Sequence, residues 1–250
     1  MTSWKKYERF VAELCSEDYQ SPSVTVMPNA KINGCLSQTT RQVDVLIDSR
    51  FGDDRNRRII VDAKKYNRPL NVKDVESFHG MMIDCSSKAG ILVCPNGYST
   101  AAKKRAQDFI NLKIVSLEEL ENIDLELWDD CLSDNCDERA ERGLVLWDAP
   151  MGIGFTASPV SISSIGKCDV CGEFHIWCWD CGKKFSLSNE SAAQCNCEHS
   201  WFWLTAIEGD EVSLNDHQQS ESVYLLLVTP IDALIADRKP FVHFPYAETV

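Results

Sequence analysis

The chain has 250 residues, of which 44% are hydrophobic and 25% charged, and its formal net charge at pH 7 is −13. This composition is typical of a packed globular protein and allows one large domain or two small ones. No run of about 18 apolar residues is present, and the first residues lack the apolar core of a signal peptide. We therefore expect no membrane partner and a cytoplasmic location, where the twelve cysteines are thiols or metal ligands rather than disulfides.

The charge is divided unevenly along the chain. Residues 1–120 contain 18 Lys and Arg against 15 Asp and Glu, a net charge of +3, whereas residues 121–250 carry −16. This difference predicts two functional units. Only the first of them is suited to approach a phosphate backbone.

Hydrophobic periodicity in residues 1–120 predicts an α/β domain. A helix is expected at 3–17, where Trp4, Tyr7, Val11 and Leu14 recur at spacings of three and four. After it we expect three strands and then a helix, a strand, a helix and a strand, at residues 23–32, 42–51, 57–66, 72–86, 89–94, 99–111 and 113–117.

The second half of the chain has a different pattern. Residues 121–150 are acidic, and we interpret them as a connecting helix or solvated linker. At its end, LVLWDAPMGIGF (144–155) is rich in strand and turn residues and is expected to open the second unit. Residues 151–250 are expected to form a small β-rich domain that contains the paired cysteines. Residues 205–250 contain one strong apolar run, VYLLLV at 223–228, and no recognisable chemistry.

Charged residues follow the apolar strand segment at 59–61. Asp62 and Lys64 are two positions apart, so in a strand they project to the same side. Asp44 lies in the preceding strand, and a hairpin across the turn at 51–56 would bring the two acids together. Two carboxylates suit Mg²⁺ or Mn²⁺, and a neighbouring lysine can orient a water or stabilise developing negative charge. The alternative is that these charges simply face solvent.

Residues 1–120 resemble the Mrr-like branch of the PD-(D/E)xK restriction endonuclease superfamily. The resemblance rests on YERFVAEL (7–14), RQVDVLI (41–47), IIVDAKKY (59–66) and GILVCPNGYSTAAKKRA (90–106). It implies a restriction-endonuclease-like core, in which helices flank a mixed sheet. It also implies the catalytic residues: Asp44 and Asp62 as the acids that hold Mg²⁺ or Mn²⁺, Lys64 as the lysine, and Glu8, or alternatively Glu13, as the helix glutamate. Asp62 departs from the glutamate that is commoner in this branch.

The resemblance implies a Mg²⁺-dependent DNA endonuclease of the restriction type, which hydrolyses phosphodiester bonds in defence against foreign DNA and acts as a homodimer. The alternatives are a catalytically inactive DNA-binding or protein-interaction module, a zinc-ribbon adaptor within a larger assembly, and a junction resolvase or repair nuclease. Basic side chains near the site in sequence are candidates for holding DNA phosphates: Arg55, Arg57, Arg58, Lys65, Arg68 and Lys73.

Six cysteines are concentrated in one short segment: Cys168, Cys171, Cys178, Cys181, Cys195 and Cys197. Two C-x-x-C-G knuckles predict zinc, because each supplies two corners of a tetrahedral site. Two knuckles with a third pair of cysteines do not fit the alternative of a redox C-x-x-C motif. Either the two knuckles share an ion, or the second knuckle pairs with Cys195 and Cys197 as in a zinc ribbon. The second arrangement leaves the first knuckle as thiols or for another ion with His175 or His199.

The remaining six cysteines, among them Cys131 and Cys136, are expected to be core or surface thiols. Aromatic residues surround the paired cysteines, and we expect most of them to pack around the metal rather than to stack on bases. The acidity of this half favours a protein partner over a nucleic-acid partner. These aromatic residues are Trp177, Trp179, Trp201, Phe202 and Trp203.

Overall fold

The chain folds into two compact units, the first mainly residues 1–127 and the second mainly residues 128–250. No helix among the described residues is long and apolar enough to cross a membrane. The structure is a computed structural model that describes residues 3–49, 57–106, 110–116, 125, 127–137, 141–155, 158–188, 192–197, 200–208, 220–228 and 242–244.

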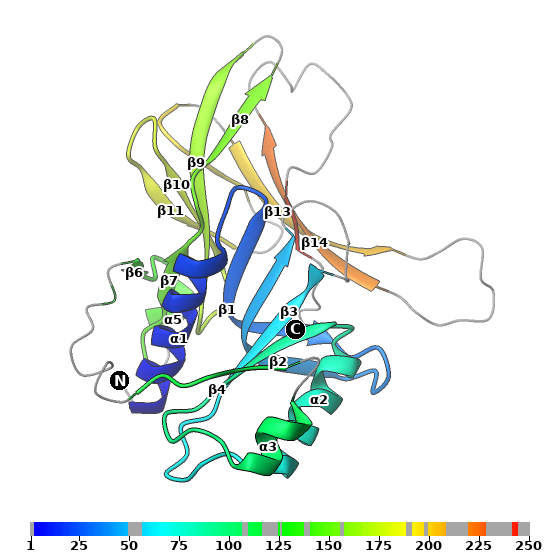
Figure 1. Cartoon of the computed structure of the whole chain (residues 1–250). Helices are drawn as coiled ribbons and strands as arrows, with labels where there is room; N and C mark the ends of the chain where they lie inside the picture. The colour runs from blue at the N-terminus through cyan, green and yellow to red at the C-terminus, as the bar shows by residue number, and fades with distance from the viewer. Residues whose placement is uncertain are drawn as a thin grey trace, which may run out of the picture. The chain divides into compact units, whose positions relative to one another are not determined.

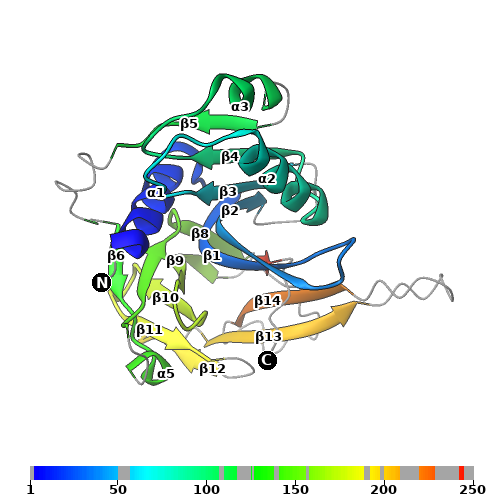
Figure 2. The same cartoon turned by 90° about the horizontal axis from the view of Figure 1, so that it is seen from below.

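The first unit is built on a mixed five-stranded sheet in the order β1-β2-β3-β4-β5. Strand β2 runs antiparallel to both β1 and β3, whereas β4 runs parallel to β3 and β5 parallel to β4. Helix α1 lies on one side of this sheet, and α2 and α3 lie on the other (Figures 1 and 2). This is the expected restriction-endonuclease-like arrangement. The elements are α1 (Ser3–Tyr19), β1 (Val24–Asn33), β2 (Thr40–Ser49), β3 (Ile59–Ala63), α2 (Val72–Asp84), β4 (Ala89–Val93), α3 (Thr100–Arg105) and β5 (Ile110–Lys113).

Helices cover both faces of the sheet, so its central strands are buried on both sides. The sequence of β2 suggests one apolar face and one more polar face, yet Val45, Leu46 and Ile47 are all buried. Asp48 is buried as well, and it is paired with Arg58, whose Nε lies 2.9 Å from Asp48 Oδ2. A strand that is covered on both faces therefore carries charge only where a partner neutralises it.

Local capping explains where α2 and α3 begin. The Asn71 side chain accepts hydrogen bonds from the Lys73 and Asp74 amides, and Asp74 accepts one from the Asn71 amide, which completes a capping box. Ser99 caps α3 in the same way through the Ala102 amide. Helix α3 ends at Arg105, earlier than the expected 99–111, and β5 begins at Ile110 rather than at residue 113.

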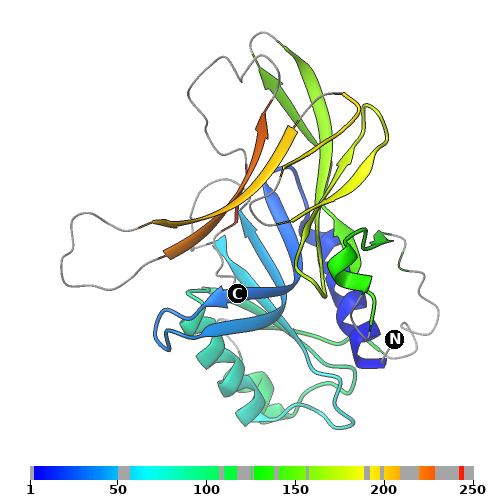
Figure 3. The same ribbon diagram turned by 180° about the vertical axis from the view of Figure 1, so that it is seen from behind.

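The described residues of the second unit form two sheets. In the larger one the strand order is β11-β10-β9-β7-β6, with β8 paired to β9; in the other it is β12-β13-β14-β15. The apolar run VYLLLV lies in β14, which is hydrogen-bonded to β13 on one side and to β15 on the other (Figure 3). The strands are β6 (Trp128–Asp130), β7 (Leu144–Trp147), β8 (Met151–Phe155), β9 (Ser158–Cys168), β10 (Phe174–Cys178), β11 (Lys184–Leu187), β12 (Ala192–Gln194), β13 (Ser200–Glu208), β14 (Ser220–Val228) and β15 (Val242–Phe244).

The interpretation of residues 121–150 as a connecting helix or linker is wrong for most of its length. Strands β6 and β7 lie within it and pair with each other in the larger sheet, with the short helix α5 (Asp134–Asp137) between them. The second unit therefore begins at Trp128 rather than at residue 151. The expectation of strands at 144–155 is confirmed by β7 and β8, whereas the acidic composition before this segment suggested solvation and concealed β6.

Candidate active site and cysteine clusters

The pairing of β2 with β3 brings the two predicted acids together. The strands pair as the predicted hairpin, with Val45 opposite Val61 and Leu46 opposite Ile60, and Asp44 and Asp62 are the residues next to the Val45–Val61 pair at the same end. The Ala63 amide donates a hydrogen bond of 2.7 Å to Asp44 Oδ2, and the two carboxyl groups lie within hydrogen-bonding reach of each other. Two oxygen donors from adjacent strands thus meet at the end of β3.

Asp44 is in an environment that disfavours its negative charge. Burial and the neighbouring Asp62 carboxylate raise the pKa of Asp44 to about 8, Glu8 adds to this effect, and the Ala63 amide opposes it. A carboxyl group with a raised pKa beside a second acid is typical of catalytic and metal-binding sites. A bound cation would relieve the repulsion between these acids.

Lys64 lies beside the acid pair. Its Nζ is 2.8 Å from Asp62 Oδ2, so the two side chains project together as the strand periodicity predicts. Burial acts to lower the pKa of the Lys64 ammonium, but Asp62 and Asp44 outweigh it and raise this pKa above its ordinary value. Lys64 is therefore positively charged at neutral pH.

Glu8 projects from α1 toward the same site. It is half-buried, and its charge contributes to the raised pKa of Asp44. Glu13, the alternative glutamate of this helix, is buried in the unit. The structure thus places Glu8 in electrostatic contact with Asp44, while its catalytic role stays a prediction.

The basic residues near the site differ in their availability to DNA. Arg58 is buried by its ion pair with Asp48 and by a hydrogen bond from Nη1 to the Cys85 carbonyl, so it cannot hold a phosphate as proposed above. Arg68 pairs with Asp74 through Nη1 and Nη2, which donate to the two carboxylate oxygens. Lys73 is exposed and Lys65 half-buried, while Arg55 lies outside the described residues.

Eight cysteines of the second unit form two groups of four. Cys178 and Cys181 group with Cys195 and Cys197, as in the zinc-ribbon arrangement predicted from the sequence. The backbone amide of Lys183 lowers the pKa of Cys181 to about 7, which favours a thiolate there. Within each group, all the sulfur atoms lie within 4.8 Å of one another, and each group could hold zinc.

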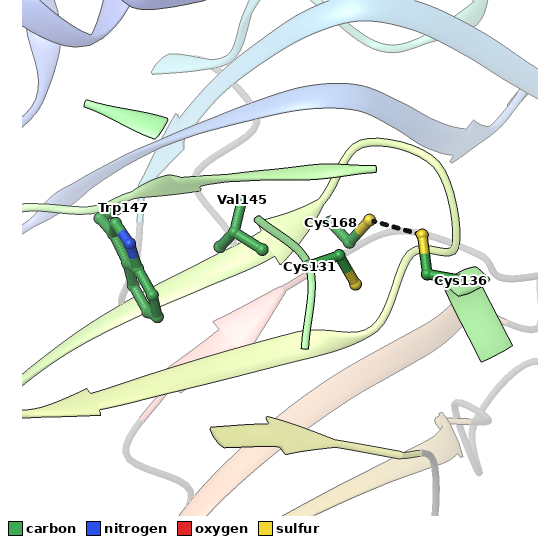
Figure 4. Packing of buried hydrophobic residues seen from close by; sticks show 5 residues of the cluster. All are labelled: Cys131, Cys136, Val145, Trp147 and Cys168. Carbon is green, nitrogen blue, oxygen red and sulfur yellow. Dashed lines mark hydrogen bonds between the residues drawn. The ribbon is translucent and has the colours of Figure 1, made fainter. Parts of the chain in front are cut away.

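The first knuckle has partners that the sequence analysis missed. Cys168 and Cys171 group with Cys131 and Cys136, which were expected to be core or surface thiols. Figure 4 shows three of the four, Cys131, Cys136 and Cys168. The C-x₄-C spacing of CLSDNC at 131–136 was the available signal, but it lies far from the other cysteines in sequence. The arrangement in which both knuckles share one ion is wrong.

His175 is near this first group but makes other contacts. Its Nε2 accepts a hydrogen bond of 3.0 Å from the Leu132 amide and lies 3.5 Å from Cys131 Sγ. Its Nδ1 lies 3.1 Å from the Glu173 carbonyl oxygen, and because that oxygen can only accept, we assign the proton to Nδ1. His175 therefore holds the backbone next to Cys131 in place through its hydrogen bond with the Leu132 amide. His199, the other candidate, lies outside the described residues.

The described tryptophans near the cysteines pack mainly on one another. Trp177 stacks on Trp179 with ring centroids 4.9 Å apart and meets Trp147 edge-on at 5.9 Å. Trp147 belongs to the hydrophobic cluster of Cys131, Cys136, Val145 and Cys168. The expected packing is thus found for Trp177, whereas the side chains of residues 201–203 lie outside the described part of the chain.

Comparison with known proteins bears on the first unit. Residues 1–123 match a family model, Mrr_cat, described as a restriction endonuclease. A crystal structure of a protein of unknown function matches at 19% identity and a TM-score of 0.37, over 46% of this chain and 64% of that one, so less than two thirds of that protein is covered. The comparison with curated proteins gave no match. Residues 1–123 are thus similar to the Mrr-type restriction endonuclease family.

Proposed function

We propose that the chain is a divalent-metal-dependent DNA endonuclease whose active site is formed by Asp44, Asp62, Lys64 and Glu8. The observation that carries this proposal is the convergence of two carboxyl groups from paired strands beside a lysine ammonium. The family match supports DNA as the substrate. Hydrolysis of a phosphodiester in such a site needs oxygen ligands for a metal ion and positive charge near the reacting phosphate.

The acid pair has the donor set of a Mg²⁺ or Mn²⁺ site. Carboxylate oxygens are the ligands that these ions prefer, and the raised pKa of Asp44 reflects its burial and the neighbouring carboxylates, whose charge a cation would neutralise. We assign Asp44 and Asp62 as the ligands, with Glu8 supporting the site from α1. When bound, such an ion polarises the phosphate and lowers the pKa of a water.

Lys64 acts as a cation rather than as a base in this proposal. Its pKa is raised by the acid pair, so the amine carries no free electron pair at neutral pH. An ammonium at this position can orient the attacking water and stabilise the negative charge that develops on the phosphate. Its ion pair with Asp62 fixes the ammonium beside the ligands.

The second unit supplies a zinc-binding accessory module in this proposal. Cys178, Cys181, Cys195 and Cys197 form a tetrathiolate site of the zinc-ribbon type, in which Cys178 and Cys197 sulfurs are 4.0 Å apart. Such a site has no open coordination position and is structural. The acidic balance of this half supports a protein partner for the module.

DNA cleavage tests the nuclease assignment. Supercoiled plasmid and linear DNA are incubated with Mg²⁺ or Mn²⁺ and the wild type, Lys64→Ala, Asp62→Asn, or Lys88→Ala, a control at an exposed lysine of the same unit. We expect the wild type and Lys88→Ala to cut, and the two site variants to lose about 10²-fold or more in rate. Linear rather than nicked plasmid as the first product would support a dimer that cuts both strands.

Three results would weigh against the proposal. Cleavage that survives in Lys64→Ala would place the activity elsewhere or in a contaminant. Loss of activity in Lys88→Ala would indicate a general effect of the substitutions. Metal-independent DNA binding without cleavage of any DNA, modified DNA included, would favour the inactive DNA-binding module.

A further inference from the structure

The four sulfur atoms of Cys131, Cys136, Cys168 and Cys171 have the spacing of a metal tetrahedron. The Cys131 and Cys171 sulfurs are 3.7 Å apart, and those of Cys136 and Cys168 are 3.9 Å apart. A tetrahedral site with zinc–sulfur bonds of about 2.3 Å has sulfur–sulfur edges of about 3.8 Å. A disulfide would require about 2.05 Å. The thiols are thus placed as ligands and not as disulfide partners.

Backbone amides point at three of these sulfurs. The Gly143 amide donates to Cys136 Sγ at 3.1 Å, and the Ser133 amide donates to Cys131 Sγ at 3.4 Å. Cys168 Sγ accepts two such bonds, from the Val170 and Cys171 amides, each at 3.4 Å. Hydrogen bonds from amides favour the charged thiolate, which is the form of cysteine that binds metal, and at Cys168 they oppose the Cys171 thiol and the burial that raise its pKa.

The two knuckles of the second unit share one backbone conformation. In the first knuckle, the Cys168 amide donates to the Glu173 carbonyl and the Gly172 amide donates to the Cys168 carbonyl. In the second, the Cys178 amide donates to the Lys183 carbonyl and the Gly182 amide donates to the Cys178 carbonyl. Gly172 and Gly182 both have positive φ, at 81° and 74°. The first knuckle therefore has the same turn as the knuckle of the predicted zinc ribbon.

The two knuckles are also too far apart to share an ion. The first precedes β10 and the second follows it, so they lie at opposite ends of this five-residue strand. A strand of this length spans about 15 Å. Each group of four sulfurs is therefore a separate site with a complete ligand set of its own.

We propose that Cys131, Cys136, Cys168 and Cys171 bind a second structural zinc ion, which attaches the α5 segment to the turn between β9 and β10. A hydrogen bond already joins α5 to this turn, because Asn135 Nδ2 donates to Glu173 Oε1 at 2.6 Å. The turn is also held to β7, where the Asp169 amide donates to the Leu144 carbonyl and the Leu144 amide donates to the Asp169 carboxylate. All four positions of the ion are filled by protein, so this site holds the fold and performs no catalysis.

Zinc stoichiometry tests this proposal on the full chain. Thiolate-bound zinc is released with a mercurial reagent and counted for the wild type, Cys136→Ser, Cys195→Ser and the control Cys35→Ser, whose half-buried thiol lies outside both groups. We expect two zinc ions per chain in the wild type and Cys35→Ser, and one in each of the other two. A single ion in the wild type, or an unchanged count in Cys136→Ser, would overturn the proposal.

Cobalt replacement of the wild type provides a result that does not depend on a variant folding. Two Co²⁺ ions per chain should bind, and both should show the d–d absorption of tetrahedral sites. The absorbance of the sulfur-to-cobalt charge-transfer band should double between the first and second equivalents. Charge transfer that stops growing after one equivalent would contradict the second site. Iron in the purified protein, visible as a red chromophore, would overturn the assignment to zinc.

Discussion

Binding of Mg²⁺ to the proposed site should release a proton, because Asp44 holds one in the metal-free protein. With a pKa of about 8, roughly nine in ten Asp44 side chains are protonated at pH 7. Mg²⁺ needs the carboxylate, so each ion that binds should displace about one proton at this pH. The apparent affinity should therefore rise about tenfold, or about 1.4 kcal/mol, for each pH unit between 6 and 7, and level off above pH 8.

Isothermal titration calorimetry measures both quantities. The zinc-loaded protein is titrated with Mg²⁺ in buffers of low and high ionisation enthalpy, and the difference in heat gives the number of protons released. Asp44→Asn should bind Mg²⁺ weakly and release no proton, whereas Asp18→Asn, at an exposed acid of α1, should behave as the wild type. An affinity that is independent of pH between 6 and 8, with no proton released, would refute this account of the acid pair.

Three further predictions concern stability and metal content. Gly143→Ala should lose one zinc ion by mercurial release, because a Cβ at this position would lie 2.1 Å from Cys168 Sγ. Arg58→Met should lower the free energy of unfolding in urea by about 3–5 kcal/mol by leaving Asp48 buried and unpaired, and adding Asp48→Leu should recover much of that loss. Asp84→Asn should cost about 1–3 kcal/mol at pH 7. Burial would raise the pKa of Asp84, but hydrogen bonds from Ser37 and from the other groups around it hold this pKa well below its ordinary value. The stabilisation is therefore present above about pH 4 and lost as the pH falls further, so the variant and the wild type should converge in acid.

The contacts that are local in sequence could be predicted well. The strand segments of β2 and β3 follow each other in sequence, which predicts a hairpin, and this pairing brings Asp44 and Asp62 together. The side-by-side placement of Asp62 and Lys64 follows from the two-residue period of a strand. The same reasoning identified both knuckles, because C-x-x-C-G is a local motif whose turn needs glycine.

The contacts that are distant in sequence could not be predicted in this way. Cys131 lies forty residues before Cys171, and no local pattern indicates that β6, α5 and β7 fold back on the first knuckle. Arg58 was grouped with solvent-facing cations because its neighbours are charged, yet the fold buries it against Asp48. In both cases tertiary packing decided the environment, and composition within a short window carries no information about it.

The order of the two cysteine groups along the chain has a consequence for how the second unit is assembled. One group joins residues 131 to 171 and the other joins 178 to 197, so the two closures follow each other without interleaving. The second loop is about half as long, so the entropic cost of closing it is about 0.6 kcal/mol lower than for the first. With zinc as the cross-link, each half can close independently of the other during synthesis. A chain that has acquired only one ion should then keep one closed loop instead of unfolding throughout.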